Sequence, residues 1–360
     1  MSTAVKDERS VSSEVDAFAE KVMAAALGWV DLMAIHLGSQ AGWYDALAKA
    51  GPMDAEELAV GTGTSRRYAQ EWLEQQSAAG ILEVDDPAGP RVRLAPGAAE
   101  VLTNRGSLSY LEPLARMLAA SGAQMPRLVE AYRSGSGVSW EEFGDHARQS
   151  QADMNRPWFD ALPEVIRSVD GLHALLSRPG ARVADIGSGA GWSSLALARS
   201  YPEATFDGFD VDDASVEMAR ENAAEAGLGD RVRFQRADAA DLAAHGPFDV
   251  IFAFECLHDM PHPVDVLSAA REAVAPGGAV VIMDEAAAET FSPEAGDLER
   301  LLYGFSLFVC LPDGLSHPGS AGTGTVMRPD TLRGYARAAG WDDVEIIVPE
   351  FGLWRFYALG

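Results

Sequence analysis

Cysteine and lysine are both scarce in this chain of 360 residues. The two cysteines, Cys256 and Cys310, lie among apolar residues and show no CxxC spacing, so we expect free thiols in a reducing compartment. No stretch offers the roughly 20 uninterrupted apolar residues of a membrane-spanning helix, and the polar N-terminus does not resemble a secretory signal. The sequence therefore predicts a cytoplasmic protein without a membrane segment.

Positive charge is also sparse, and lysine occurs only at positions 6, 21 and 49. Lys and Arg together number 28 against 54 Asp and Glu, which gives a net charge of −26. A surface of this sign repels nucleic acid and anionic lipid. We therefore expect no nucleic-acid or membrane partner, and a small-molecule substrate instead.

The chain is expected to have three regions, at residues 1–105, 106–178 and 179–360. The first begins with an amphipathic pattern, in which apolar residues recur at steps of three and four from Val15 to Leu37. A stripe this long packs either on its own domain or on a second subunit. We favour a homodimer.

Three short helices and a hairpin follow, in the order typical of a winged-helix domain. Asp54 is expected to cap the second of these helices, with Glu57 at the capping-box position. The expected segments are helices at 42–47, 54–58 and 65–79, and strands at 81–84 and 91–94 around a turn at 85–90.

A winged helix invites a DNA-binding interpretation. However, nine Lys and Arg residues oppose sixteen Asp and Glu residues up to position 105, a net charge of −7. Glu71 and Glu74 also follow Arg66 and Arg67 on the helix that would enter the groove, where a basic face is needed. A transcriptional regulator is therefore the least favoured of our functional hypotheses.

The middle region is helical in pattern, and we expect Pro113, Pro126, Pro157 and Pro163 to interrupt it. From residue 182 onwards, strands alternate with helices, which is typical of an α/β, doubly wound, Rossmann-like sheet. A turn at 275–278 is expected to lead into the fifth strand, and an insertion is expected at about 286–327. The strands should begin at Val183, Thr205, Val232, Phe248, Ala279, Val344 and Trp354, and the helices near Trp192, Ala214, Pro263 and Pro329.

A glycine-rich turn follows the first strand of this region and is the best candidate for a cofactor site. Glycine allows a tight turn and lets a ligand approach the backbone amides. The spacing G-x-G-x-G differs from the dinucleotide pattern G-x-G-x-x-G. S-adenosyl-L-methionine (SAM) has no phosphate but has an α-ammonium group, which an acidic residue here can hold. The candidate residues of this turn are Asp185, Gly187, Ser188, Gly189 and Gly191.

The ends of the next three strands supply further candidates for cofactor binding. Asp210, followed by Val211, lies 23 residues after Gly187, where a carboxylate is expected to meet ribose hydroxyls. Asp238 and the Ala239 amide are expected to meet the adenine, although Asp238 is equally suited to cap a helix. Glu255 follows the fourth strand and is included in the cofactor set.

Taken together, these segments resemble the successive motifs of class I SAM-dependent methyltransferases. Residues 43–102 are similar to the winged-helix domain of bacterial small-molecule methyltransferases, as are the segments 155–157 and 320–329. The resemblance implies SAM as cofactor, S-adenosyl-L-homocysteine (SAH) as product, and a front domain that dimerises and encloses the substrate. The segments that carry the first resemblance are 183–192, 208–210, 236–239 and 275–278.

The segment Leu257-His258-Asp259 resembles the one that bears the catalytic histidine of winged-helix O-methyltransferases. His258 is therefore the candidate general base, with Asp284 or Glu285 orienting its ring; an imidazole suits this task near neutral pH. Alternatively, His258 lines the pocket without moving protons. A metal site of His258, Asp259 and His262 has weak support from spacing alone, so we expect no metal.

The acceptor is expected to be enclosed by Trp158, Phe159, Tyr303 and His317, although core packing explains any one aromatic residue equally well. The favoured function is O-methylation of a small molecule in secondary metabolism, with nitrogen or carbon less favoured as acceptor. The alternative is a SAM-dependent enzyme that catalyses cyclisation or rearrangement on the same fold.

Overall fold

In a computed structural model, the structure describes residues 2–86 and 91–360. The chain divides into two compact units, residues 1–119 and 120–360, and each is described by itself. Most of the turn expected at 85–90 lies outside the described residues.

The first unit has the helix, helix, helix and hairpin order of a winged-helix domain, as the sequence predicts. Asp54 and Glu57 form the expected capping box. Strands β1 and β2 pair in antiparallel fashion. The elements are α1 (Ser2–Gln40), α2 (Trp43–Ala50), α3 (Ala55–Thr62), α4 (Arg66–Ala78), β1 (Leu82–Asp86), β2 (Arg91–Leu94) and α5 (Pro96–Thr103).

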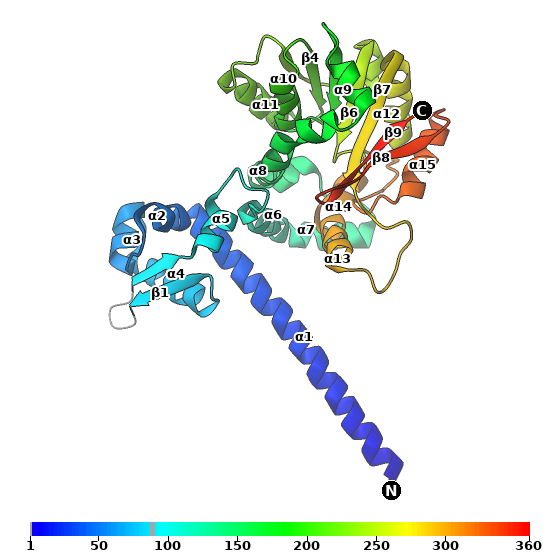
Figure 1. Cartoon of the computed structure of the whole chain (residues 1–360). Coiled ribbons are helices and arrows are strands. Elements are labelled where there is room, and N and C mark those ends of the chain that lie inside the picture. The colour runs from blue at the N-terminus through cyan, green and yellow to red at the C-terminus, as the bar shows by residue number, and fades with distance from the viewer. Residues whose placement is uncertain (1, 87–90) are drawn as a thin grey trace. The chain divides into compact units, whose positions relative to one another are not determined.

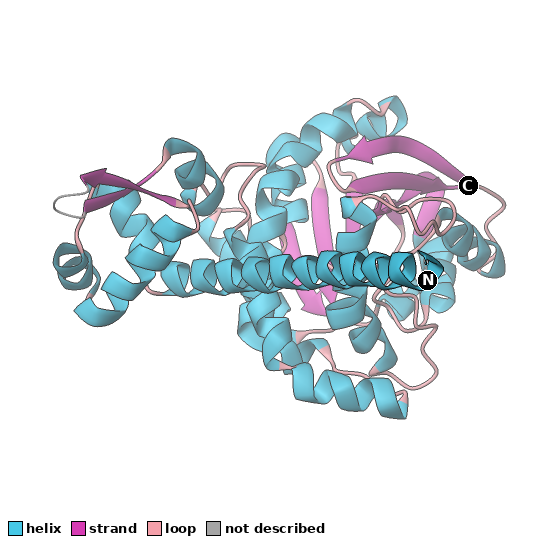
Figure 2. Cartoon of the chain, turned by 90° about the horizontal axis from the view of Figure 1, so that it is seen from below, coloured by secondary structure: helices cyan, strands magenta, loops and turns pink. Residues whose placement is uncertain are grey.

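Helix α1 is longer than the rest of its unit can cover (Figures 1 and 2). Its C-terminal part packs on α4, where Trp72 Nε1 donates to the Ala34 carbonyl at 2.8 Å and Gln75 Nε2 donates to Asp31 at 2.9 Å. Upstream, large apolar side chains such as Phe18 and Trp29 are exposed. By length and composition the segment 13–40 could cross a membrane, but charged residues such as Asp16, Lys21 and Asp31 interrupt its apolar run.

Four helices follow: α6 (Glu112–Ala123), α7 (Met125–Ser134), α8 (Trp140–Arg167) and α9 (Asp170–Leu176). Pro113 and Pro126 lie at the second position of a helix, where no amide hydrogen bond is lost. The expectation that Pro157 and Pro163 interrupt the helical structure is wrong, because both lie inside α8 and are buried there. Burial of neighbouring Leu162 and Ile166 in the core stabilises α8 through both prolines.

The second unit is built on a seven-stranded sheet of order β5-β4-β3-β6-β7-β9-β8, in which β9 runs opposite to the other six strands. Strand β7 begins at Val274, so the expected turn at 275–278 is part of the strand. Val274 pairs with Phe248, and a register shift after that pair accommodates the glycines. The strands are β3 (Arg182–Ile186), β4 (Thr205–Asp210), β5 (Val232–Arg236), β6 (Phe248–Phe254), β7 (Val274–Glu285), β8 (Val344–Phe351) and β9 (Trp354–Leu359).

Helices cover both faces of the sheet, as the doubly wound prediction requires (Figure 1). Helices α8 to α11 contribute to the core on one face, while η1, α12 and α15 contribute to the other. The strand order reverses between β3 and β6, and open α/β sheets bind ligands beyond the carboxyl ends of their strands at such a switch point. The remaining elements are α10 (Trp192–Ser200), α11 (Asp213–Glu225), η1 (Ala239–Ala244), α12 (Pro263–Ala273), α13 (Asp297–Phe305), η2 (Ser306–Cys310), α14 (Leu311–Leu315) and α15 (Pro329–Ala338).

Candidate active site at the carboxyl edge of the sheet

The turn between β3 and α10 requires its glycines. Gly187, Gly189 and Gly191 all have positive φ angles, of 65°, 50° and 78°. A Cβ atom at Gly187 would also collide with Cys256, at 2.7 Å from its sulfur, whereas the space beside Gly189 is open. The turn is thus held tightly on one side and leaves its middle open to a ligand.

Asp210 lies at the end of β4, beside this turn. Its Oδ2 accepts from the Gly189 amide at 2.8 Å, and its Oδ1 accepts from the Asp212 amide at 2.9 Å. Burial raises the pKa of Asp210 against the effect of these two hydrogen bonds. The carboxylate is therefore held in one orientation at the carboxyl end of β4.

Asp185 is almost fully buried at the end of β3. Its Oδ2 accepts from the hydroxyls of Ser193 and Ser194 at 2.6 and 2.7 Å, and burial raises its pKa to about 6. Its Oδ1 is buried with no hydrogen-bond partner among the described residues, and so are Ser188 Oγ and Trp192 Nε1. Unsatisfied buried polar atoms are rare and often mark a missing ligand. One acceptor and two donors here fit the ammonium and carboxylate groups of SAM.

At the end of β5, Asp238 caps η1 by accepting from the Ala240 amide at 2.9 Å, which is the capping role weighed from the sequence. The side chain is exposed, so its other oxygen stays accessible, while Ala239 is buried. Val211, the residue after Asp210, is 59% exposed and presents an apolar side chain to solvent.

Sequence reasoning missed an ion pair beside this edge. Arg148 of α8 binds Asp212 through two hydrogen bonds, at 2.6 and 3.1 Å. Asp212 also caps α11 by accepting from the Ser215 amide at 2.9 Å. Nothing in the local sequence pattern links the two residues, because their contact depends on how α8 crosses the sheet.

Glu255 follows β6 and is the one non-glycine residue described with a positive φ, of 52°. Its Oε2 accepts from Asn155 Nδ2 at 2.7 Å, a contact that sequence reasoning also missed. Burial and then the nearby charge of Glu285 raise the pKa of Glu255 to about 8. The backbone of Glu255 is therefore strained, and its carboxyl group tends to hold a proton at neutral pH.

His258 is buried at the start of the loop between β6 and α12. Its Nδ1 lies 3.0 Å from Asp284 Oδ1 and 3.1 Å from Glu285 Oε2, both at the end of β7. Burial alone would lower the pKa of His258, but the charges of Asp259, Asp284 and Glu285 raise it well above its usual range. The two carboxylates orient the ring, so that Nε2 faces away from them.

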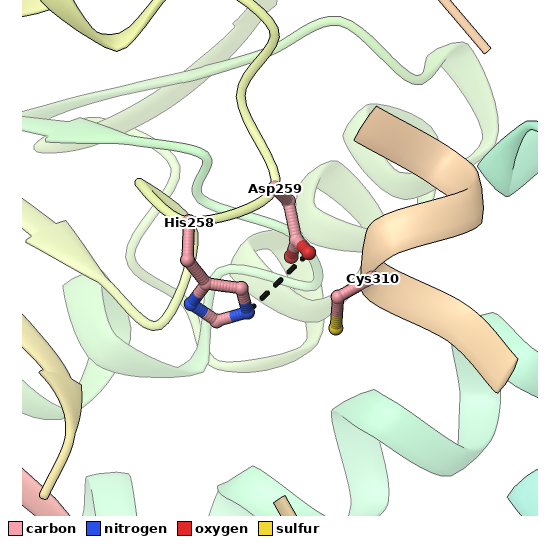
Figure 3. A group of neighbouring side chains, drawn as sticks. All are labelled: His258, Asp259 and Cys310. Carbon is pink, nitrogen blue, oxygen red and sulfur yellow. Dashed lines mark ion pairs between the residues drawn. The ribbon is translucent and has the colours of Figure 1, made fainter. Parts of the chain in front are cut away.

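Two further groups lie on the Nε2 side of this ring (Figure 3). Asp259 Oδ1 is 3.3 Å from Nε2, and the Cys310 thiol of η2 lies within reach of both. The sequence suggested His262 as the third member, but among the described residues it is Cys310, from the insertion, that joins His258 and Asp259. His262 is exposed.

The four residues expected to enclose the acceptor do not gather at this site. Trp158 packs edge-on against Phe351 and Trp354, and Phe159 packs against Phe254 in the core. For these two, the core-packing alternative describes the structure. Tyr303 lines a hollow of about 470 Å³ together with Phe291, and its hydroxyl accepts from Arg328 at 3.1 Å. His317 is exposed after α14.

The fold and the edge of the sheet define the class of protein: a class I, Rossmann-like methyltransferase fold with an N-terminal winged-helix domain. Comparison with known families agrees for both parts. Residues 177–305 match a family described as "Methyltransferase domain", and residues 29–104 match an "Rv2258c-like winged HTH domain". The chain therefore combines a methyltransferase domain with a winged-helix domain, and the family resemblance predicted from its motifs is confirmed.

Individual relatives are more distant. The chain is 35% identical over 120 residues to the 27-O-demethylrifamycin SV methyltransferase of Amycolatopsis mediterranei, a match to 33% of this chain and 44% of that one; the chain thus spans less than half of this relative. An O-methyltransferase family protein from Burkholderia thailandensis superposes with a TM-score of 0.69 at 21% identity, over 96% and 97% of the two chains. Human N-acetylserotonin methyltransferase, solved with SAM, gives 0.67 at 21% identity, over 95% and 97%.

Proposed function

We propose that this chain is a SAM-dependent enzyme that transfers a methyl group to an oxygen atom of a small hydroxylated metabolite. One observation carries the proposal: Asp185, Asp210 and Asp238 end three adjacent parallel strands beside the switch point of the sheet. His258 follows the next strand. The similarity to a rifamycin-pathway methyltransferase supports a substrate from secondary metabolism.

The cofactor residues would divide the molecule between them. Asp210 would accept from the ribose hydroxyls, since its orientation is already fixed by two backbone amides. Asp185 and Ser188, with their unpartnered buried atoms, would hold the amino-acid end. Asp238 and the Ala239 amide would meet the adenine. Each charged hydrogen bond is worth about 1.5–3 kcal/mol.

At the acceptor, we assign His258 as general base. Nε2 would take the proton from the acceptor hydroxyl, while Asp284 holds Nδ1–H and stabilises the imidazolium that forms. When bound, SAM supplies an electrophilic methyl group on a positively charged sulfur, a charge that also favours the neutral form of a nearby imidazole. Holding both reactants in line supplies much of the remaining acceleration.

Calorimetric titration with SAM and SAH tests the cofactor assignment. We expect both to bind the full chain, and Asp210→Ala to weaken them at least about tenfold. Asp213→Ala is the matched control, since Asp213 lies three residues further on but is exposed and pairs with Arg236 at the surface. Failure of either ligand to bind the wild-type chain would remove the proposal.

We further propose that the active form is a cytoplasmic homodimer whose subunits pair through α1. Along this helix Phe18, Leu27 and Trp29 are more than half exposed, which is unusual for a monomer. The α1 helix is better suited to a second copy than to a bilayer. Its segment 13–40 contains Asp16, Glu20, Lys21 and Asp31, and a charge at the centre of a bilayer costs about 2.5–3.5 kcal/mol.

A further inference from the structure

The insertion after β7 contributes the side chain of Cys310 to the candidate active site. Its thiol meets His258 and Asp259, so that a nitrogen, an oxygen and a sulfur atom all lie within 4.8 Å of one another (Figure 3). These are the three ligand types that Zn²⁺ prefers. The proposed methyl transfer assigns no role to Cys310.

The spacing of the ion pair between His258 and Asp259 also fits two ligands of one metal ion. Their atoms Nε2 and Oδ1 are 3.3 Å apart. With usual Zn–N and Zn–O lengths, the corresponding edge of a tetrahedral site is about 3.4 Å. Within the described chain, Asp259 Oδ1 has no hydrogen-bond partner although it is shielded from solvent. A carboxylate oxygen that meets an imidazole nitrogen only as an ion pair, beside a thiol, is a set of three atoms that one metal ion can join.

The other side of the imidazole is also arranged as in metal sites. Histidine ligands commonly donate the second ring N–H to a carboxylate, which fixes the tautomer and leaves the opposite nitrogen free to bind. Here Asp284 lies 3.0 Å from Nδ1 and is fully buried. Nε2 therefore faces Asp259 and Cys310, and it becomes free to bind an ion once its proton has left.

We propose that His258, Asp259 and Cys310 bind a soft divalent cation of the Zn²⁺ type, with the fourth position open. The Cys310 thiol and the protonated imidazole of His258 each lose a proton to solvent when the Zn–S and Zn–N bonds form, so the three ligands bring two negative charges to a doubly positive ion. Several acidic groups surround the ring, and a cation relieves their mutual repulsion. The hydroxyl of Thr325, buried beside the Cys310 thiol, lies at the edge of the site.

One consequence rests on the proposed function. A cation on Nε2 occupies the nitrogen that would take the acceptor's proton, so Zn²⁺ would inhibit methyl transfer in competition with the acceptor. Binding of the ion itself does not depend on methyl transfer.

The test uses the full chain freed of metal by dialysis against a chelator and then titrated with Co²⁺ or Zn²⁺. Cobalt bound to a thiolate absorbs in the near ultraviolet by charge transfer, which reports the sulfur ligand directly. We expect this band and one Zn²⁺ per chain in the wild type and in Cys256→Ser, whose altered thiol faces the Ile186 carbonyl instead. Cys310→Ser should lose the band and bind Zn²⁺ at least tenfold more weakly.

Asp259→Asn should keep the cobalt band at lower affinity, and Asp284→Asn should weaken Zn²⁺ by about 10- to 100-fold. SAH titration of each variant confirms that the domain is folded. A band that survives in Cys310→Ser, or a wild-type chain that binds neither metal, overturns the proposal. Zn²⁺ binding without SAH binding would leave the metal site standing and remove the methyltransferase assignment, and the converse would remove the site alone.

Discussion

Arg148 and Asp212 form a two-point ion pair that ties α8 to the first turn of α11, next to the Asp210 carboxylate. Their side chains are only 7% and 13% exposed, and the same Asp212 caps α11. This pair fixes α8 to the strand end that is expected to bind ribose.

Removing Arg148 should therefore destabilise the second unit. Arg148→Ala leaves Asp212 largely buried without its cation, so we expect a loss of about 3 kcal/mol in the free energy of unfolding. Arg236→Ala is the control, because its pair with Asp213 is exposed and worth about 0–1 kcal/mol. Chemical denaturation measures the free energy of unfolding of both variants. Equal losses would show that the buried pair stabilises the unit no more than the exposed pair does.

The same pair has a defined pH dependence. Burial opposes ionisation of Asp212, but the hydrogen bonds from Arg148 and Ser215 lower its pKa below the usual carboxyl value. A lowered folded-state pKa gives stability that is present above the unfolded pKa and is lost as the pH falls through the folded one. The stability gap between wild type and Arg148→Ala should consequently shrink below about pH 4.

Cofactor affinity should weaken in acid through Asp185. Burial raises the pKa of this carboxyl to about 6, so at pH 5 it is mostly neutral and no longer attracts the ammonium group of SAH. We expect SAH binding to weaken by about tenfold between pH 7 and pH 5. Asp185→Asn should bind weakly and with little pH dependence over this range; calorimetry at both pH values decides.

The base assignment predicts a split between catalysis and binding. Once screening of hydroxylated small molecules gives a product heavier by one CH₂, His258→Ala should lower kcat by about 10²- to 10⁴-fold and leave SAH affinity unchanged. His262→Ala, at an exposed site in the same loop, is the control. Near-normal turnover in His258→Ala would refute the assignment, and a product without the added CH₂ would favour cyclisation or rearrangement.

Pairing through α1 predicts a change of mass in solution. Trp29→Glu places a charge on the exposed apolar face of the helix, so light scattering should show a dimer for the wild type and a monomer for the variant. Glu20→Gln, a polar change on the same helix, should remain dimeric. A wild-type monomer would contradict the proposed pairing.

The strands of the second unit were predictable because buried parallel strands are short apolar runs that end in turn residues. Val232, Phe248 and Trp354 begin strands where expected. The G-x-G-x-G spacing was enough to predict the glycine turn. The prediction that Pro157 and Pro163 interrupt the helix was wrong, because local helix propensity does not include the stabilisation of α8 by burial in the core.

The missing parts of the site are contacts between distant segments. Asn155 meets Glu255, and Cys310 meets His258, only because α8 and the insertion fold back to the sheet edge. Periodicity and spacing contain no information about such meetings. Trp158 shows the reverse case: an aromatic residue was assigned to substrate with core packing as the alternative, and it packs edge-on against Phe351 of β8 and Trp354 of β9.

Strand β9 lies between β7 and β8 in the sheet although it is the last of the three in the chain. During synthesis, β8 leaves the ribosome before the strand that must separate it from β7 exists. Until β9 arrives, the backbone amides and carbonyls at the β7 edge have no neighbour, and an unpaired edge of this kind invites pairing with other chains. Folding of the catalytic unit is therefore completed late, and a nascent chain stalled just after β8 should be its most aggregation-prone form.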